Sequence, residues 1–259
     1  MPLVLCGFEG SVGTLTLSHA EKRNALGEAL IGELLAGLAD CRRRGVRVVV
    51  IRAQAGSSVW SAGHDVAELP QSHRDPLGWD NPLRRLIRAV EELPAAVIAM
   101  VEGSVWGGAC ELVFACDLIV AAREATFAVT PAKLGIPYNL TGLLTFMSVA
   151  SLHVLKEMAF TARPMGAERA ERLGIVNRVV GTEELERATA ELAGQIALNA
   201  PLSIAVMKEE LNTLSNARDL SPLDFERIQA RRRSVYNSRD YEEGIRAFLE
   251  KRHADFTGE

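Results

Sequence analysis

Short, almost wholly apolar runs recur through the first half of the chain, separated by helical or glycine-rich segments. Three of them are residues 46–51 (VRVVVI), 95–101 (AAVIAMV) and 118–122 (LIVAA), whose length and composition are typical of strands. Residues 12–17 (VGTLTL) alternate apolar and polar side chains, as a half-buried strand does. Residues 25–41 carry leucine at every fourth position, which indicates one face of a helix. Strands and helices in repeated alternation predict an α/β core with parallel strand pairing.

After about residue 142 the pattern becomes helical throughout. The segments with helical patterning are 149–160, 167–173, 183–198, 202–214, 223–236 and 241–251. Pro201 stands where a first-turn proline belongs, and Ser238 is a suitable N-cap. We therefore predict an α/β core over residues 1–200, which carries the functional site, and an all-helical region over residues 201–259.

Charge and hydropathy exclude several classes of function. The chain has 29 Lys and Arg against 33 Asp and Glu, a net charge of −4, whereas non-specific nucleic-acid binding needs a basic face. The apolar stretch 95–122 is long enough for a membrane span, but it contains Glu102, Glu111 and Asp117. Each carboxylate would cost about 3 kcal/mol in hydrocarbon. We therefore expect neither a nucleic-acid nor a membrane partner.

The spacing of cysteine and histidine predicts neither disulfides nor a metal site. The four cysteines form no C-x-x-C pair, and the five histidines show no H-x-x-x-H or H-E-x-x-H spacing. Reduced thiols, together with an N-terminus that lacks the basic start of a secretory signal, predict a cytoplasmic protein.

Three segments are too rich in glycine, or too mixed in polarity, to be simple core: 61–70, 101–111 and 130–139. Glycines just before a helix let the backbone approach a ligand closely and direct N–H groups at it, and the helix dipole favours an anion there. Gly107 and Gly108 therefore suit a developing negative charge, although a tight packing turn would explain the pair equally well.

The polar residues of these segments also have structural explanations. His64 taken alone favours a structural role, Asp65 suits the cap of a short helix, and Glu111 lies in a first turn where the dipole stabilises it. Tyr138 is directed either into a cavity or to the surface of its loop. The basic runs 42–44 and 231–233 are interpreted as solvated helix ends.

Taken together, these segments resemble the crotonase, or enoyl-CoA hydratase/isomerase, superfamily over residues 12–251. The resemblance rests on four strings: KRNAL at 22–26, SAGHD at 61–65, GGACE at 107–111 and AERAERLGIVNRVV at 167–180. It implies a repeated ββα spiral core with a C-terminal helical oligomerisation region, as a trimer or a dimer of trimers. It also implies an acyl-CoA thioester substrate, with coenzyme A as part of the substrate and no other cofactor. In such a site the thioester oxygen is held by two backbone N–H groups, here those of His64 and Gly108.

One departure from the family pattern narrows the reaction. Family hydratases carry two glutamates, but here Pro131 stands in the place of the second, which leaves Glu111 alone. Hydration needs a positioned acid and a positioned base, each worth about 10²–10⁴-fold, so we expect a poor hydratase. Decarboxylation needs no base, because the carboxylate of the substrate leaves as CO₂ and the thioester takes up the electron pair.

Within the superfamily, the strings SAGHDVAELP, VEGSVWGGA and LGIPYN look closest to members that decarboxylate methylmalonyl-CoA to propionyl-CoA, and we predict this activity. The resemblance implies that Tyr138 and Thr130 orient the carboxylate or return the proton. It implies further substrate-binding residues: Lys22, Ala62, Asp65, Val66, Ala67, Glu68 and Lys251. Glu111 is either catalytic or, if it pairs with an arginine such as Arg84, structural.

Two alternatives stay open at this point. The chain could be an enoyl-CoA hydratase/isomerase-type enzyme that acts on another acyl-CoA, or an acyl-CoA-binding protein that has kept the fold without catalysis. Gly108 and the SAGHD string argue against lost catalysis, and a turnover assay with crotonyl-CoA and methylmalonyl-CoA would separate the enzymes.

Overall fold

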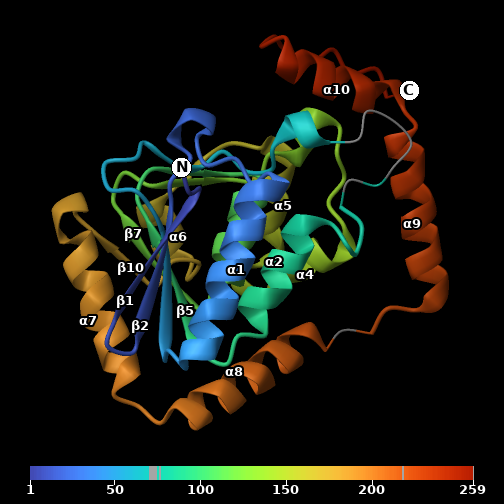
Figure 1. Cartoon of the computed structure of the whole chain (residues 1–259). Helices are drawn as coiled ribbons and strands as arrows, with labels where there is room; N and C mark the ends of the chain where they lie inside the picture. The colour runs from blue at the N-terminus through green and yellow to red at the C-terminus, as the bar shows by residue number, and fades with distance from the viewer. Residues whose placement is uncertain (70–74, 76, 218, 259) are drawn as a thin grey trace.

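In the described part of the chain, two β-sheets form the core, and helices cover both faces of the larger sheet (Figure 1). The computed structural model describes residues 1–69, 75, 77–217 and 219–258. The larger sheet has the spatial order β1 (Val4–Glu9), β2 (Val12–Leu17), β3 (Val48–Ala53), β5 (Ala96–Val101), β7 (Leu118–Ala122) and β10 (Arg178–Val180). The smaller sheet has the order β4 (Val59–Ser61), β6 (Ser104–Trp106), β8 (Thr126–Ala128) and β9 (Met165–Gly166).

Helices alternate with the strands in the first half of the chain and predominate in the second half. The α-helices are α1 (Glu28–Arg44), α2 (Pro82–Glu91), α3 (Gly108–Ala115), α4 (Leu140–Val149), α5 (Leu152–Thr161), α6 (Ala167–Arg172), α7 (Leu185–Ala197), α8 (Pro201–Asn216), α9 (Pro222–Tyr236) and α10 (Arg239–Leu249). Short 3-10 helices are η1 (Ala20–Lys22), η2 (Val66–Glu68), η3 (Pro131–Leu134) and η4 (Thr182–Glu184).

The core repeats one unit of two strands and a helix. Within the described residues the successive units are β3–β4–α2, β5–β6–α3 and β7–β8–α4. Each unit contributes one strand to the larger sheet and one to the smaller sheet, and the strands of successive units pair in parallel. The predicted α/β fold with parallel pairing and a repeated ββα core is therefore confirmed. The strands of the smaller sheet are too short to show a pattern in the sequence.

Burial on both faces of the larger sheet explains the uninterrupted apolar runs. Val49 and Ile51 of β3 pack into the core that contains the apolar faces of α1 and α2, whereas Val48 and Val50 pack against α7. Helix α7 accordingly lies across the sheet from α1 and α2 (Figure 1). A strand buried in this way has no polar face, so polar residues do not alternate along it.

Helix α1 begins at Glu28, three residues later than the leucine spacing predicts. Leu26 is instead paired with His64 in a parallel bridge, and its N–H donates to the Gly63 carbonyl at 2.7 Å. The Glu68 carboxylate accepts the Glu28 N–H at 2.8 Å. The residues that precede α1 therefore hold the segment 63–68 in place.

Helices α8, α9 and α10 pass around one side of the core, from its lower end to its upper end in Figure 1. Pro201 is the first residue of α8, and the Ser238 side chain caps α10, as predicted. The buried ammonium of Lys208 fastens α8 to the core, since it donates to two backbone carbonyls and to the Asp117 carboxylate at 2.8 Å. The division at residue 200 coincides with the start of α8, but it stays a prediction.

The interpretation of 231–233 as a solvated helix end is wrong for Arg232. Arg231 and Arg233 are exposed, but Arg232 is only 5% exposed, and its guanidinium donates hydrogen bonds within the fold. Its neighbours along the sequence gave no sign of this, because the burial comes from contacts with distant segments. The other basic run, 42–44, is exposed.

Three further findings concern membrane spans, metal sites and the cysteines. In the described ranges no single helix is long and apolar enough to cross a membrane, although one pair bent by 104°, Thr182–Ala197 and Pro201–Asn216, passes the same test jointly. Among the described residues no group of three His, Cys, Asp or Glu side chains could hold a metal ion. The four cysteines are free thiols.

Candidate active site

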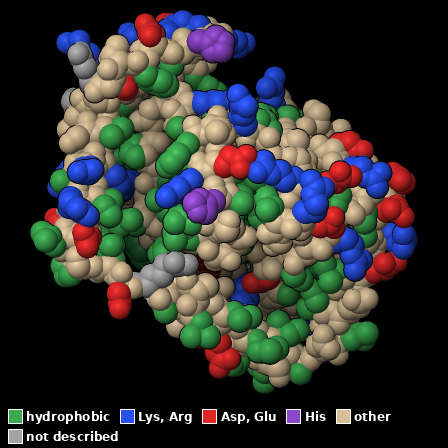
Figure 2. Space-filling view, turned by 180° about the vertical axis from the view of Figure 1, so that it is seen from behind, with side chains coloured by type: hydrophobic (Ala, Val, Ile, Leu, Met, Phe, Trp, Pro, Cys, Tyr) green, Lys and Arg blue, Asp and Glu red, His purple; other side chains and the backbone are tan. Residues whose placement is uncertain are grey.

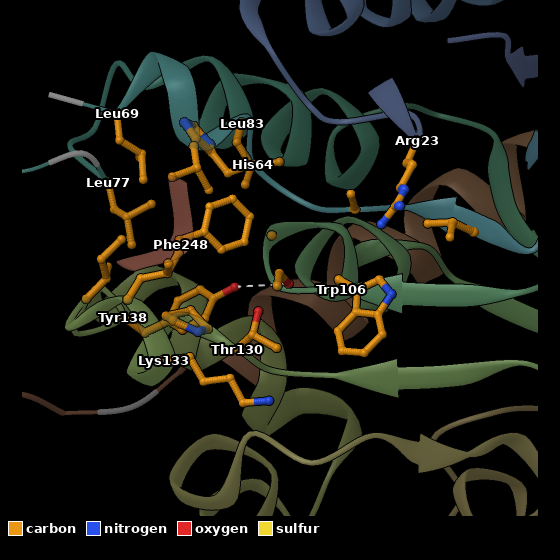
Figure 3. Close-up of a pocket in the computed structure, with 18 residues that line it drawn as sticks. Arg23, His64, Leu69, Leu77, Leu83, Trp106, Thr130, Lys133, Tyr138 and Phe248 are labelled. Atoms are coloured by element: carbon orange, nitrogen blue, oxygen red, sulfur yellow. Dashed lines mark hydrogen bonds between the residues drawn. The ribbon is translucent and has the colours of Figure 1, made fainter. Parts of the chain in front are cut away.

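A cavity of about 310 Å³ lies where the N-terminus of α3 meets β4, β6 and η3. Arg23 and Trp106 lie toward one end of it, and Leu69, Leu77 and Phe248 toward the other (Figure 3). The side chains between them are mostly apolar. Among the described residues that line the cavity, none is Asp or Glu.

Glycines let two backbone segments meet at this cavity. Gly63 has a φ of +85°, and a Cβ atom there would lie 2.3 Å from the Trp106 carbonyl oxygen. Gly107 has a φ of +53°, which also favours glycine. A Cβ atom on Gly108 would lie 3.6 Å from the backbone nitrogen of His64. The structure therefore brings together the two amides that the family resemblance pairs.

Within the described residues, both of these amide N–H groups are without an acceptor. No described residue accepts a hydrogen bond from the N–H of His64 or of Gly108, and both residues line the cavity. Gly108 is the first residue of α3, where the partial positive charge of the helix dipole lies. Two unpaired donors that share one cavity suit a developing oxyanion.

Two hydroxyl groups stand beside the glycine pair. Tyr138 donates to the Gly107 carbonyl at 3.3 Å (Figure 3), and its ring packs nearly perpendicular to that of Phe146 with 5.0 Å between centroids. Thr130 Oγ1 would lie 3.0 Å from a Cβ atom on Gly107. Burial, with a smaller effect of the Glu111 carboxylate, raises the pKa of Tyr138 well above its usual value, so the phenol is protonated at neutral pH.

The His64 imidazole is neutral at pH 7, because burial lowers its pKa. Its Nδ1 atom is buried, and no described residue forms a hydrogen bond with it. General-base histidines are oriented by a partner on this nitrogen. The arrangement therefore favours the backbone of residue 64, rather than its side chain, as the functional group.

Glu111 is 1% exposed and is not among the described residues that line the cavity. Its carboxylate pairs with the Arg84 guanidinium, which confirms the partner named from the sequence. Burial raises the pKa of Glu111 to about 7, and Arg84 opposes the shift. A Cβ atom on Gly142 would lie 3.0 Å from Glu111 Oε1 and 2.8 Å from Tyr138 Cδ1. The ion pair therefore lies near the Tyr138 ring, and neither of its residues belongs to the described lining of the cavity.

Several predicted substrate-binding residues hold the loop around His64. Asp65 accepts the Ala67 N–H at 3.1 Å, which confirms that it caps a short helix, here η2. Its other carboxylate oxygen pairs with Lys22 at 3.0 Å. Glu68 binds the first N–H of α1, as described above. These side chains are committed to contacts within the protein, and none of the three lines the cavity in the described lining.

Only some of the other predicted binding residues line the cavity. Ala62 and Val66 line the cavity, whereas Ala67 is exposed and lies outside the described lining. Lys251 is exposed just beyond α10, and its N–H donates at 3.1 Å to the carbonyl of Phe248, which does line the cavity.

Arg23 lines the cavity but was not identified from the sequence. It and Asn24 both have a φ of +52°, which is uncommon outside glycine. Asn24 stabilises this turn, since it accepts the His19 N–H at 2.8 Å and donates to the Trp60 carbonyl at 2.9 Å. The asparagine of KRNAL was the available signal, because asparagine tolerates the left-handed conformation.

Comparison with known proteins identifies the family of the chain. A model of the enoyl-CoA hydratase/isomerase family matches residues 7–259. The chain belongs to this family. The superfamily named from the sequence strings is therefore confirmed, and nearly the whole chain is matched.

Relatives in the enoyl-CoA hydratase/isomerase family include enzymes of different reactions. Methylmalonyl-CoA decarboxylase of Escherichia coli (strain K12) is 48% identical over 247 residues, or 95% of each chain. Carnitinyl-CoA dehydratase of Escherichia coli (strain K12) is 36% identical over 259 residues, or 96% of each chain. A solved structure of methylmalonyl-CoA decarboxylase in complex with 2-nitronate-propionyl-CoA matches with a TM-score of 0.98, 47% identity and 99% of each chain covered.

Proposed function

We propose that this chain decarboxylates methylmalonyl-CoA to propionyl-CoA. The composition of the cavity carries the proposal. Its amide N–H groups at His64 and Gly108 have no acceptor among the described residues, hydroxyls lie at Tyr138 and Thr130, and its described lining holds no carboxylate. Hydration would need a positioned acid and a positioned base at the reacting carbons, and the hydratases of the family carry two glutamates for this. Similarity to a methylmalonyl-CoA decarboxylase supports the same reaction.

The reaction needs a sink for one electron pair. The bond between C2 and the carboxylate breaks, CO₂ leaves, and the pair passes into the thioester carbonyl to give an enolate oxygen. We assign the amides of His64 and Gly108 to this oxygen, and each such donor is worth roughly 3–4 kcal/mol in comparable sites. A proton then adds to C2 and gives propionyl-CoA.

The apolar walls favour loss of CO₂. Leu83, Leu134 and Ile136 line the cavity together with the amides. A carboxylate held among such side chains is poorly solvated, whereas neutral CO₂ loses little there. Part of the binding energy of the coenzyme A portion therefore offsets the cost of placing the carboxylate in this site.

Tyr138 and Thr130 are assigned to the carboxylate end, where they orient the leaving group or return the proton. The protonated phenol of Tyr138 is in the correct state to donate to C2. Glu111 takes a structural role in this assignment, because its carboxylate is paired with Arg84 near the Tyr138 ring.

Coenzyme A enters as part of the substrate, and no other cofactor is required for this chemistry. Ala62 and Val66 line its path, and Lys22 and residues 65–68 shape the loop that presents the His64 amide. Lys251 supplies positive charge for the phosphate groups of coenzyme A in this proposal.

Release of CO₂ from a panel of 2-carboxyacyl-CoA thioesters tests the proposal. We expect turnover of methylmalonyl-CoA with formation of propionyl-CoA, and little hydration of crotonyl-CoA in the same preparation. Faster hydration of crotonyl-CoA would support the hydratase alternative instead. Binding of propionyl-CoA without turnover of any thioester would identify an acyl-CoA-binding protein.

Tyr138→Phe is expected to lower the turnover number for methylmalonyl-CoA by about 10²-fold, because a lost proton donor or acceptor typically costs at least this much. The affinity for the product propionyl-CoA should be retained, since the ring still packs on Phe146. Steady-state kinetics and a titration with propionyl-CoA measure the two effects. Unchanged turnover would remove the Tyr138 hydroxyl from the mechanism.

We also propose that the chain forms a trimer or a dimer of trimers in the cytoplasm. Support comes from α8, which exposes a row of apolar side chains: Leu202, Val206, Met207, Leu211 and Leu214. Hydrophobic side chains gather along the lower edge of the molecule in Figure 2, where α8 lies. Contiguous exposed apolar surface is typical of an interface. Free thiols at all four cysteines suit a reducing compartment.

Leu211→Glu is expected to reduce the mass of the assembly measured by light scattering, because Leu211 is 66% exposed within this row and a buried charge opposes association. Thr213→Glu is the matched control, since it adds the same charge at an exposed polar position of the same helix. An unchanged mass for Leu211→Glu would show that the α8 row is not the interface.

A further inference from the structure

Helix α9 contacts the surroundings of the cavity through one buried guanidinium. Arg232 is 5% exposed and does not belong to the described lining of the cavity. Its Nη2 donates to Asp75 Oδ1 at 2.8 Å and to the Tyr236 hydroxyl at 3.0 Å, and its Nη1 donates to Gln229 at 3.1 Å. One side chain of the helical region is therefore bonded both to its own helix and to a loop of the core.

The contact with Asp75 leads to one wall of the cavity. The same oxygen, Asp75 Oδ1, also accepts the N–H of Leu77 at 2.9 Å, and Leu77 lines the cavity. The Leu77 carbonyl accepts from Asn139 Nδ2 at 2.6 Å. Asn139 follows Tyr138 directly and caps α4. The guanidinium thus fixes the turn that carries Leu77, and this turn is bonded to the residue next to Tyr138.

The contact with Tyr236 leads to the other wall. The Tyr236 hydroxyl, which accepts from Arg232, donates to the Pro137 carbonyl at 3.1 Å. Pro137 directly precedes Tyr138. The Tyr236 ring is buried and packs edge to face on Tyr241 of α10, with 5.5 Å between centroids. The segment that carries Tyr138 is therefore held on both sides, at Pro137 from Tyr236 and at Asn139 from Leu77.

The chemistry of the side chain explains why an arginine stands here. A guanidinium presents several donors in a fixed plane, so it can bond a carboxylate and a hydroxyl at once, and charge-assisted bonds of this kind are about twice as strong as neutral ones. A lysine has a single ammonium at the end of a flexible chain and holds such a pair less well. Arg231 and Arg233, which flank Arg232, carry the same charge, but both are exposed.

We propose that Arg232 is a positioning residue for decarboxylation, because its bonds to Asp75 and Tyr236 hold the Leu77 and Tyr138 walls in register from outside the cavity. This rests on the proposed function of the cavity. The residue acts through Tyr138 and does not touch the substrate. Its removal therefore leaves the His64 and Gly108 amides in place and displaces the hydroxyl that works beside them.

The kinetic test compares Arg232→Met with Arg231→Met, which removes the same charge from an exposed neighbour. We expect Arg232→Met to lower the turnover number for methylmalonyl-CoA by about 10-fold to 10²-fold, since displacements near 1 Å have costs of this order. The KM should change much less, because the segments that carry the amides are separate from these bonds. Arg231→Met should match the wild type, and Arg232→Lys should recover part of the loss. Equal kinetics for Arg232→Met and Arg231→Met would overturn the proposal.

A double-mutant cycle with Tyr138→Phe distinguishes positioning from a general loss of stability. If Arg232 acts through the Tyr138 hydroxyl, Arg232→Met should have little further effect on turnover once that hydroxyl is absent. Independent, multiplying losses would show that Arg232 stabilises the fold without positioning Tyr138. Wild-type turnover, measured beside the cycle, shows separately whether the proposed reaction itself occurs.

Hydrogen–deuterium exchange tests the same bonds without reference to any reaction. We expect Arg232→Met to raise exchange in peptides covering residues 77–86 and 136–146, and Arg231→Met to leave both unchanged. Tyr236→Phe is the milder variant: it removes only the hydroxyl and should raise exchange in residues 136–146 alone. It serves as the test if Arg232→Met does not fold. Unchanged exchange in a folded Arg232→Met or Tyr236→Phe protein would contradict the proposal.

Discussion

His64→Pro is expected to lose turnover of methylmalonyl-CoA by about 10²–10³-fold, the usual effect of removing one oxyanion donor, whereas His64→Ala keeps most of it. Proline has no N–H, but alanine retains the amide and removes only the imidazole. No described residue accepts a hydrogen bond from this N–H, so proline breaks no bond within the described protein. The bridge beside it uses the Gly63 carbonyl and the Asp65 N–H, which both variants keep. Steady-state release of CO₂ measures the difference.

The comparison is informative because the two substitutions separate backbone from side chain. Thermal unfolding of both variants is the control, since a folded His64→Pro protein must be established before its kinetics are interpreted. Equal losses in the two variants would indicate that the imidazole performs the chemistry. That result would contradict the assignment of residue 64 as a backbone donor.

Elements whose signal lies within a few residues could be predicted from the sequence. Strands β2 (Val12–Leu17) and β7 (Leu118–Ala122) have the bounds that their apolar patterns gave, and the starts of α8 and α10 follow from a proline and a serine. The smaller sheet could not be predicted in this way, because β4, β6 and β8 have three residues each and depend on pairing with one another. The late start of α1 likewise depends on a distant partner, His64.

The candidate site shows the same division between local and distant causes. The glycines beside His64 and Gly108 were recognisable, because a positive φ and a close backbone approach both require glycine. The direction in which the Asp65 carboxylate points could not be recognised from the sequence. A polar residue beside the site can either bind a ligand or, as Asp65 does, hold its own loop. Arg232 stands 157 residues from its partner Asp75, and no local pattern reports such a contact.

Gly63→Ala is expected to lower turnover by about 10²-fold. The substitution moves the His64 and Gly108 amides apart, and a displacement of about 1 Å in a catalytic site can cost this much in rate. Its Cβ atom would lie 2.3 Å from the Trp106 carbonyl oxygen and 3.2 Å from the Gly108 nitrogen, both of them backbone atoms. The loop that carries His64 must therefore move away from the start of α3. The strain of a positive φ adds roughly 1–2 kcal/mol to the loss of stability.

Gly56→Ala is the control that isolates the effect of this close approach. Gly56 has a φ of +79°, close to the +85° of Gly63, but a Cβ atom on it would meet nothing within 4 Å. Both variants therefore carry the conformational cost, and Gly63→Ala alone carries the collision. Thermal unfolding should show a moderate loss of stability for Gly56→Ala with turnover retained. Wild-type turnover in Gly63→Ala would mean that the two amides need not be held this close, and the oxyanion assignment would then fail.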